Sequence, residues 1–185
     1  MEKAIGLVET TSIARGIEAA DAMVKTAAVK LYLARSVCPG KYIILIGGEV
    51  DAVSSSVQRA REVVGEYMAD VILITNVHDG LFPAIEGITE IGDINRQWAL
   101  GVIETFGVAS CILAADTALK AADVTLLDVR PAVGLGGKSF TVMIGEVSAV
   151  ESAVDAGKER IEAEGSMVSF TVIPNISKEV LRELL

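Results

Sequence analysis

Residues 4–10 read Ala-Ile-Gly-Leu-Val-Glu-Thr, and residues 99–105, 95 positions further along, read Ala-Leu-Gly-Val-Ile-Glu-Thr. The similarity continues through most of both halves of the chain, so chance does not explain it. Two extra residues lie between Leu126 and Gly137, because beyond them the offset between the copies is 97. A repeat of this length is the size of a small domain and is too long for a solenoid unit.

Each copy contains the same series of hydrophobic patterns. In the first copy an apolar strand over residues 4–9 precedes a helical pattern, and two strands then meet around Cys38-Pro39-Gly40. A second amphipathic helix and a closing strand over residues 71–74 follow. The order β-α-β-β-α-β predicts an α+β fold with a ferredoxin-like sandwich in each copy.

The domain boundaries follow from this repeat. We expect the first domain at residues 1–93 and the second at residues 94–185, with residues 89–95 linking them.

The composition excludes several classes of protein. The 185 residues are 51% hydrophobic, but the longest apolar runs are strand-sized, whereas a membrane helix needs roughly 20 residues. A net charge of −9 argues against nucleic-acid binding. The first residues lack the features of a signal peptide, and with two cysteines this indicates free thiols in the cytoplasm. We expect so apolar a chain to bury surface against copies of itself.

Cys38 is the candidate for special chemistry. It precedes Pro39-Gly40, a turn signal, so we expect it at the tip of a loop, where a thiol is exposed and able to react or bind. The alternative is a small buried hydrophobic residue. We interpret Cys111, the counterpart of Gly16, as a buried residue of a helix.

Two further sets of polar residues have a structural and a functional interpretation. Glu9 and Glu104 repeat at the ends of the first strands, where a hydrogen bond at a strand end or helix start is favoured over a pair of catalytic carboxylates. His78, the single histidine, is interpreted as a surface or capping residue. With 4% aromatic residues as well, the chain offers little material for an enzyme, and we expect none.

The repeated blocks over residues 4–10, 20–29 and 40–53 resemble the bacterial microcompartment (BMC) shell domain, twice and over nearly the whole chain. Two domains in unpermuted order, with Cys-Pro-Gly-Lys at residues 38–41, are similar to the tandem-domain type known from propanediol-utilising microcompartments. The family's Ile-Pro-Arg-Pro-His ending is altered at residues 74–78 and 173–177, and neither copy has the arginine.

The resemblance implies a homotrimer that forms a pseudo-hexagonal tile, and tiles that join other shell proteins edge to edge. It implies that Cys38 of each chain is the metal ligand of an iron–sulfur cluster, [4Fe–4S], one per trimer, at the central pore. It also places Lys25 and Lys120 at the tile edge, although each permits an intrahelical pair with an aspartate four residues earlier. No nucleic-acid or membrane partner is expected.

Several functions remain open at this point. The cluster would pass electrons across the shell to an enclosed redox enzyme, or would itself be cargo for one. The tile would alternatively be purely structural, or a metabolite pore without a cofactor, with Cys38 an incidental thiol. A small-molecule-binding signalling trimer with a duplicated ferredoxin-like fold is the third interpretation.

Overall fold

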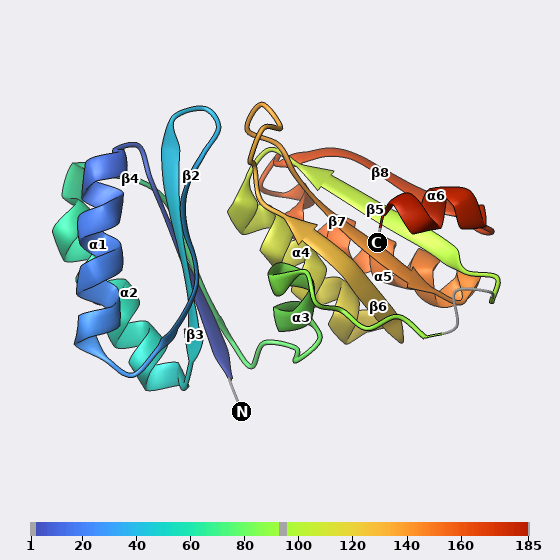
Figure 1. Ribbon diagram of the computed structural model, residues 1–185, viewed down its shortest axis with the longest axis horizontal. Helices are drawn as coiled ribbons and strands as arrows, with labels where there is room; N and C mark the ends of the chain where they lie inside the picture. The colour runs from blue at the N-terminus through green and yellow to red at the C-terminus, as the bar shows by residue number, and fades with distance from the viewer. Residues whose placement is uncertain (1–2, 93–95, 185) are drawn as a thin grey trace. The chain divides into compact units, whose positions relative to one another are not determined.

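The computed structural model describes residues 3–92 and 96–184. The chain divides into two compact units, one comprising residues up to 77 with residues 133–137, and the other comprising the remainder from residue 78 onward (Figure 1). The expected boundary between residues 93 and 94 lies outside the described residues. Residues 81–86 form a helix that packs within the second unit.

The first unit is a four-stranded antiparallel sheet with two helices on one face (Figure 1). The strands lie in the order β2-β3-β1-β4, which is the ferredoxin-like arrangement predicted from the order of the patterns. The elements along the chain are β1 (Ala4–Thr10), α1 (Ile13–Thr26), β2 (Lys30–Val37), β3 (Lys41–Gly48), α2 (Val50–Val64), the 3-10 turn η1 (Gly65–Tyr67) and β4 (Met68–Thr75).

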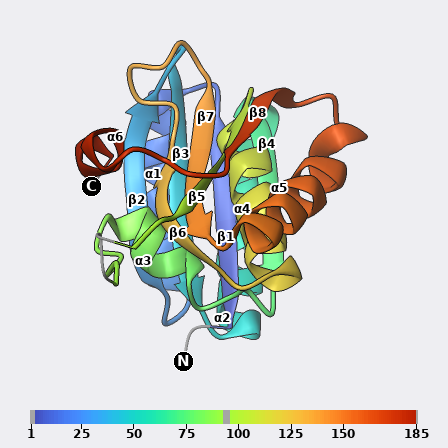
Figure 2. The same ribbon diagram turned by 90° about the vertical axis from the view of Figure 1, so that its right-hand side faces the viewer.

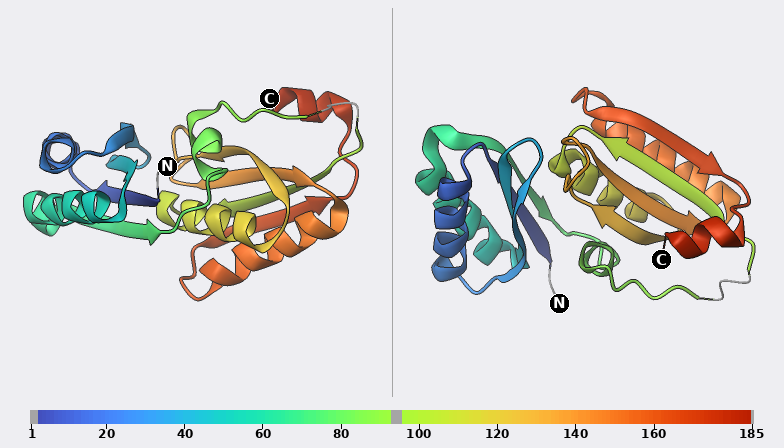
Figure 3. Two further views of the ribbon diagram at one scale, coloured as in Figure 1. Left: turned by 90° about the horizontal axis from the view of Figure 1, so that it is seen from below. Right: turned by 45° about the horizontal axis from the view of Figure 1, so that its top comes forward.

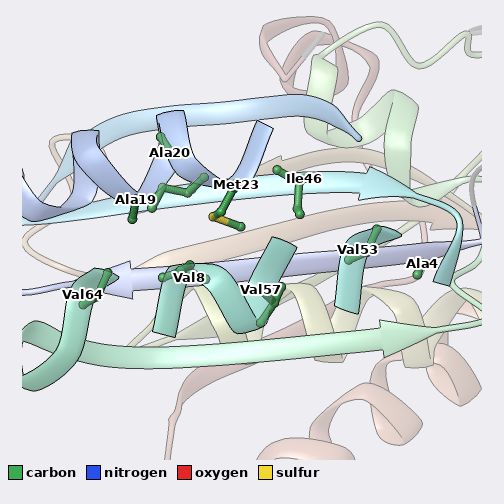
Figure 4. Close-up of a cluster of buried hydrophobic side chains, with 11 residues drawn as sticks. Ala4, Val8, Ala19, Ala20, Met23, Ile46, Val53, Val57 and Val64 are labelled. Atoms are coloured by element: carbon green, nitrogen blue, oxygen red, sulfur yellow. The ribbon is translucent and has the colours of Figure 1, made fainter. Parts of the chain in front are cut away.

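The core of this unit lies between the sheet and its two helices. Val8 of β1 and Ile46 of β3 pack with Met23 of α1 and with Val53 and Val57 of α2 (Figure 4). Ser12 caps the start of helix α1: its side chain accepts a hydrogen bond from the backbone N–H of Arg15 and so satisfies one free donor of the first turn.

The central glycine of the repeated strand has a packing role in both copies. A Cβ atom on Gly6 would lie 2.6 Å from Cγ2 of Val57, and one on Gly101 would lie 2.7 Å from Cγ2 of Val154. These distances are shorter than any ordinary carbon contact, so only glycine lets the second helix of each copy approach the sheet this closely. This requirement explains why the same glycine stands in both copies.

The second unit repeats the arrangement, with strand order β6-β7-β5-β8. Helices α4 and α5 cover one face of this sheet, and helix α6 (Lys178–Glu183) lies over the other (Figures 2 and 3). The irregularity between Leu126 and Asp128 of β6 matches the one between Leu31 and Leu33 of β2. The elements are β5 (Ala99–Thr105), α4 (Val108–Ala121), β6 (Val124–Arg130), β7 (Ser139–Gly145), α5 (Val147–Glu162) and β8 (Met167–Ile173).

Two short helices were not predicted from the sequence. Helix α3 (Leu81–Glu86) and helix α6 (Lys178–Glu183) each follow the last strand of a copy. Leu81 of α3 and Leu181 of α6 are buried, so each helix is held by an apolar anchor. Among the described residues, no helix is both long and apolar enough to cross a membrane.

Candidate functional site

Cys38 lies in the turn of the β2–β3 hairpin, as the sequence predicted. Val37 pairs with Lys41 across the hairpin, so residues 38–40 form the connection. Gly40 has a φ of +76°, a left-handed conformation that favours glycine. Cys38 is half-buried and its thiol is free. A free thiol therefore stands in a tight turn whose left-handed position is occupied by a glycine.

The corresponding loop of the second copy has different chemistry. Residues 131–138 join β6 to β7, and Gly134, Gly136 and Gly137 there have positive φ values. The loop contains no cysteine or histidine, and its Val133 is exposed. The chain therefore offers one thiol, not two, at its hairpin turns.

An ion pair stands beside each of these turns. The Glu9 carboxylate lies 3.2 Å from Nζ of Lys41, and Lys138 Nζ donates to Oε1 of Glu104 at 2.7 Å. Lys41 begins β3, and its counterpart Lys138 directly precedes β7. Each glutamate is thus engaged by a lysine of the neighbouring strand, which agrees with the structural interpretation of a strand-end contact. Sequence reasoning missed the lysine partners, because finding them requires the strand register.

Cys111 is buried on α4, as predicted, at a position where the first copy has a closely packed glycine. Its counterpart Gly16 faces Tyr42 so closely that a Cβ atom would lie 2.6 Å from Cδ1 of the ring. In the second copy the counterpart of Tyr42 is Ser139, which is fully buried. The equivalent positions therefore hold glycine and tyrosine in the first copy but cysteine and serine in the second.

Burial also determines the reactivity of Cys111. Burial away from water, together with the nearby Asp128 charge, raises the pKa of this thiol to about 12, although a hydrogen bond with Thr105 acts in the opposite direction. A thiol with so high a pKa is almost entirely protonated at neutral pH, and the thiolate is the form that binds metals and reacts. Cys111 is therefore a packing residue.

The two lysines expected at the tile edge have different surroundings. Nζ of Lys25 donates to Asp21 at 2.6 Å with both side chains largely exposed, so this ion pair contributes little. Lys120 donates to Asp116 at 2.5 Å, and the Asp116 side chain is only 6% exposed. Asp116 also accepts the backbone N–H of His78 at 2.8 Å. Lys120 therefore has a structural task that Lys25 lacks.

His78 stabilises the turn before α3. Its Nδ1 accepts the backbone N–H of Gly80 at 3.1 Å, in agreement with its interpretation as a surface or capping residue. Within the described part of a single chain, no group of three or more His, Cys, Asp or Glu side chains is arranged to hold a metal ion.

Comparison with known proteins follows the repeat. The family described as BMC domain matches residues 4–77 and again residues 99–176. The bacterial microcompartment shell protein PduT of Citrobacter freundii is 40% identical over 185 residues, which is 100% of this chain and 99% of that protein. The shell protein EutM of Salmonella typhimurium is 43% identical over 77 residues, 41% of this chain and 77% of its own.

A solved structure is also similar over the whole chain. The crystal structure of a microcompartment protein from Desulfitobacterium hafniense has a TM-score of 0.92 and 46% sequence identity, covering 98% of this chain and 99% of that one. The sequence-based expectation of two tandem domains of this kind is thereby confirmed.

Proposed function

Because this chain belongs to the BMC-domain family and is a bacterial microcompartment shell protein similar to PduT, we propose that three chains close into one flat tile of such a shell, with an iron–sulfur cluster held by their Cys38 thiols. That the chain is a shell protein follows from its family. The trimer, the cluster and its electron-transfer role are the proposed parts.

The number of chains follows from the repeat. Two related but unlike domains give one chain two unlike sides, and an interface between unlike sides closes into a ring when the rotation fits. A hexagonal outline made of six similar domains needs three such chains. This trimer would join neighbouring shell proteins along its edges, with Lys25 and Lys120 in these contacts.

The residues present fit an iron–sulfur cluster on two grounds. Cys38 is a free, partly accessible thiol rather than half of a disulfide, and thiolates are the ligands that such clusters take. A cuboidal cluster takes about four ligands, while each chain supplies one thiol at this turn. Three chains around a threefold axis supply three thiols, and a small ligand completes the set. We therefore propose a single [4Fe–4S] cluster per trimer.

The chemistry that such a group supplies is the transfer of single electrons, here between the inside and the outside of the shell. The chain's own contribution is to hold the ligand. Gly40 sets the left-handed turn beside the thiol, and the pair between Glu9 and Lys41 fixes the start of β3 directly after it. An enclosed redox enzyme is the proposed recipient of the electrons.

The observation that carries the proposal is the free thiol of Cys38, which stands in one of the two equivalent hairpin turns of the chain. It is tested by iron and sulfide analysis of the wild type, Cys38→Ser and Cys111→Ser after anaerobic reconstitution. We expect about one cluster per three chains in the wild type and in Cys111→Ser, and none in Cys38→Ser, because a neutral hydroxyl is a poor ligand for iron.

Cys111→Ser is the matched control, since it removes the other thiol of the chain without touching the turn. A wild-type protein that remains free of iron would overturn the proposal of a cluster and favour a purely structural tile. Loss of iron in Cys111→Ser together with its retention in Cys38→Ser would mean that the wrong thiol has been chosen.

A further inference from the structure

The longer hairpin loop of the second copy lies against the Cys38 turn of the first copy. Residues 133–137 of this loop group with the first unit of the chain, although the repeat places them in the second copy. A Cβ atom built on Gly137 would lie 3.3 Å from Cδ of Pro39 and 3.5 Å from the carbonyl oxygen of Cys38. The backbone of Gly137 therefore packs directly on the peptide that joins Cys38 to Pro39.

The sequence of the loop explains how it can take this path. The second copy has two extra residues before Gly137, and Gly134, Gly136 and Gly137 all have left-handed φ values, which allow sharp changes of direction. Ala132 is buried, so the start of the loop is held in place. The first copy has neither the extra length nor the run of glycines at its own turn.

Gly137 and its counterpart Gly40 are constrained in different ways. Both have a positive φ, which is +90° at Gly137 and +76° at Gly40. A Cβ atom on Gly40 would meet nothing within 4 Å, and the same is true of Gly134. Backbone conformation alone therefore favours glycine at residues 40 and 134, whereas residue 137 has no free space for a side chain either.

The atom that faces Gly137 cannot move aside by itself. Cδ of Pro39 is part of the pyrrolidine ring and is bonded to the backbone nitrogen, so no side-chain rotation takes it away from a new Cβ atom. A side chain at residue 137 would instead push the loop and the Cys38 turn apart. The peptide that follows the Cα atom of Cys38 would shift, and the thiol would shift with it.

We infer that Gly137 is a positioning residue for the Cys38 thiol, so that the copy of the domain without a cysteine at its turn holds the turn of the copy that has one. The identity of the group that the thiol binds rests on the proposed function. Residues that contact a metal ligand fix its orientation and so tune the metal site. Because each chain of the proposed trimer has the same contact, a change at residue 137 would act on all three thiolate ligands at once.

The test compares Gly137→Ala with the matched control Gly134→Ala. Both variants place alanine at a left-handed position of the same loop, at φ values of +90° and +71°, but only the alanine at residue 137 meets the Cys38 turn. Gly137→Asn is the second variant, because asparagine carries the same Cβ atom and adopts left-handed conformations more readily than alanine. Far-UV circular dichroism of the full-length proteins checks that all three variants are folded.

The first readout is the rate at which iodoacetamide alkylates Cys38 in protein freed of iron by a chelator. We expect this rate to rise several-fold in both Gly137 variants, because separation of the loop from the turn exposes more of the half-buried thiol, and to stay at the wild-type value in Gly134→Ala. The second readout is the electron paramagnetic resonance spectrum of the reconstituted, reduced cluster. Its g values should change in both Gly137 variants and not in Gly134→Ala.

An alkylation rate or a spectrum that neither Gly137 variant alters would overturn the positioning role. Equal changes in Gly134→Ala and Gly137→Ala would also overturn it, because backbone strain in the loop would then account for the effect without the contact. A wild-type protein that takes up no iron would instead contradict the proposed cluster. The alkylation rates are measured without iron, so they would still decide the role of Gly137 in that case.

Discussion

The close approach of Gly16 to Tyr42 predicts a strong energetic coupling between these two positions, which are occupied by Cys111 and Ser139 in the second copy. In Gly16→Cys the new Cβ atom would lie 2.6 Å from Cδ1 and 2.7 Å from Cβ of Tyr42. The Cβ atom of Tyr42 is fixed to the backbone of β3, so rotating the ring cannot relieve the overlap. Such overpacking costs about 1–3 kcal/mol, and the helix propensity gained by replacing glycine returns only about 0.3–0.5 kcal/mol.

Tyr42→Ser is expected to be destabilising for the opposite reason. Removal of a fully buried aromatic side chain costs about 3–5 kcal/mol, and Tyr42 is only partly buried, so we expect about 2 kcal/mol. The double variant Gly16→Cys/Tyr42→Ser reproduces the pair found in the second copy. The serine removes the ring atoms Cγ and Cδ1 but keeps Cβ, so it relieves part of the overlap with the cysteine. The double variant should therefore be more stable than the sum of the single effects predicts, by about 1 kcal/mol.

The measurement is urea unfolding of the four proteins, followed by far-UV circular dichroism with a reducing agent present. All four are compared at one protein concentration, because the stability of an oligomer depends on it. Single effects that add within about 0.5 kcal/mol would refute the coupling, since residues that do not share a contact behave in this way.

Three further predictions concern the lysines and the buried thiol. Lys120→Ala should lower the urea midpoint more than Lys25→Ala, because it leaves the buried Asp116 carboxylate without its cation, and equal midpoints would contradict this. Electron microscopy should find fewer extended sheets for both variants. In protein freed of iron by a chelator, iodoacetamide at pH 8 should label one thiol per native chain and two per unfolded chain, since the pKa of Cys111 is about 12. Two labels on the native chain would contradict the burial of Cys111. Because the pKa of Cys111 is raised in the folded state, its contribution to stability is fully present below pH 9 and is lost between pH 9 and 12. The free energy of unfolding of the wild type should therefore fall more steeply above pH 9 than that of Cys111→Ala. Parallel curves for the two proteins would contradict this.

The repeat made most of the fold predictable. Strand and helix patterns that are ambiguous in one copy become clear when residues 4–10 and 99–105 carry the same glycine between the same apolar neighbours. The short helices α3 and α6 were missed because six residues make less than two turns, which is too short for a periodic pattern. Their buried side chains, Leu81, Phe82 and Ala84 of α3 and Leu181 of α6, are anchors that only the tertiary structure reveals.

The site was predictable only in part. The Cys38 turn followed from Pro39-Gly40, whose local chemistry is independent of the rest of the fold. The lysine partners of Glu9 and Glu104, and the contact of Gly16 with Tyr42, depend on which residues face each other across strands or between a helix and a strand. That information arises from register and packing, so the sequence of one chain did not supply it.

The most direct measurement is the native mass spectrum of anaerobically purified full-length protein. Three chains of 19.4 kDa each should be observed together at about 58 kDa, with the added mass of a single iron–sulfur cluster, and Cys38→Ser should retain the three chains without that addition. A wild-type protein that is observed as a single chain would contradict the trimeric tile. A Cys38→Ser trimer that still carries the mass of the cluster would contradict its binding by the Cys38 thiols.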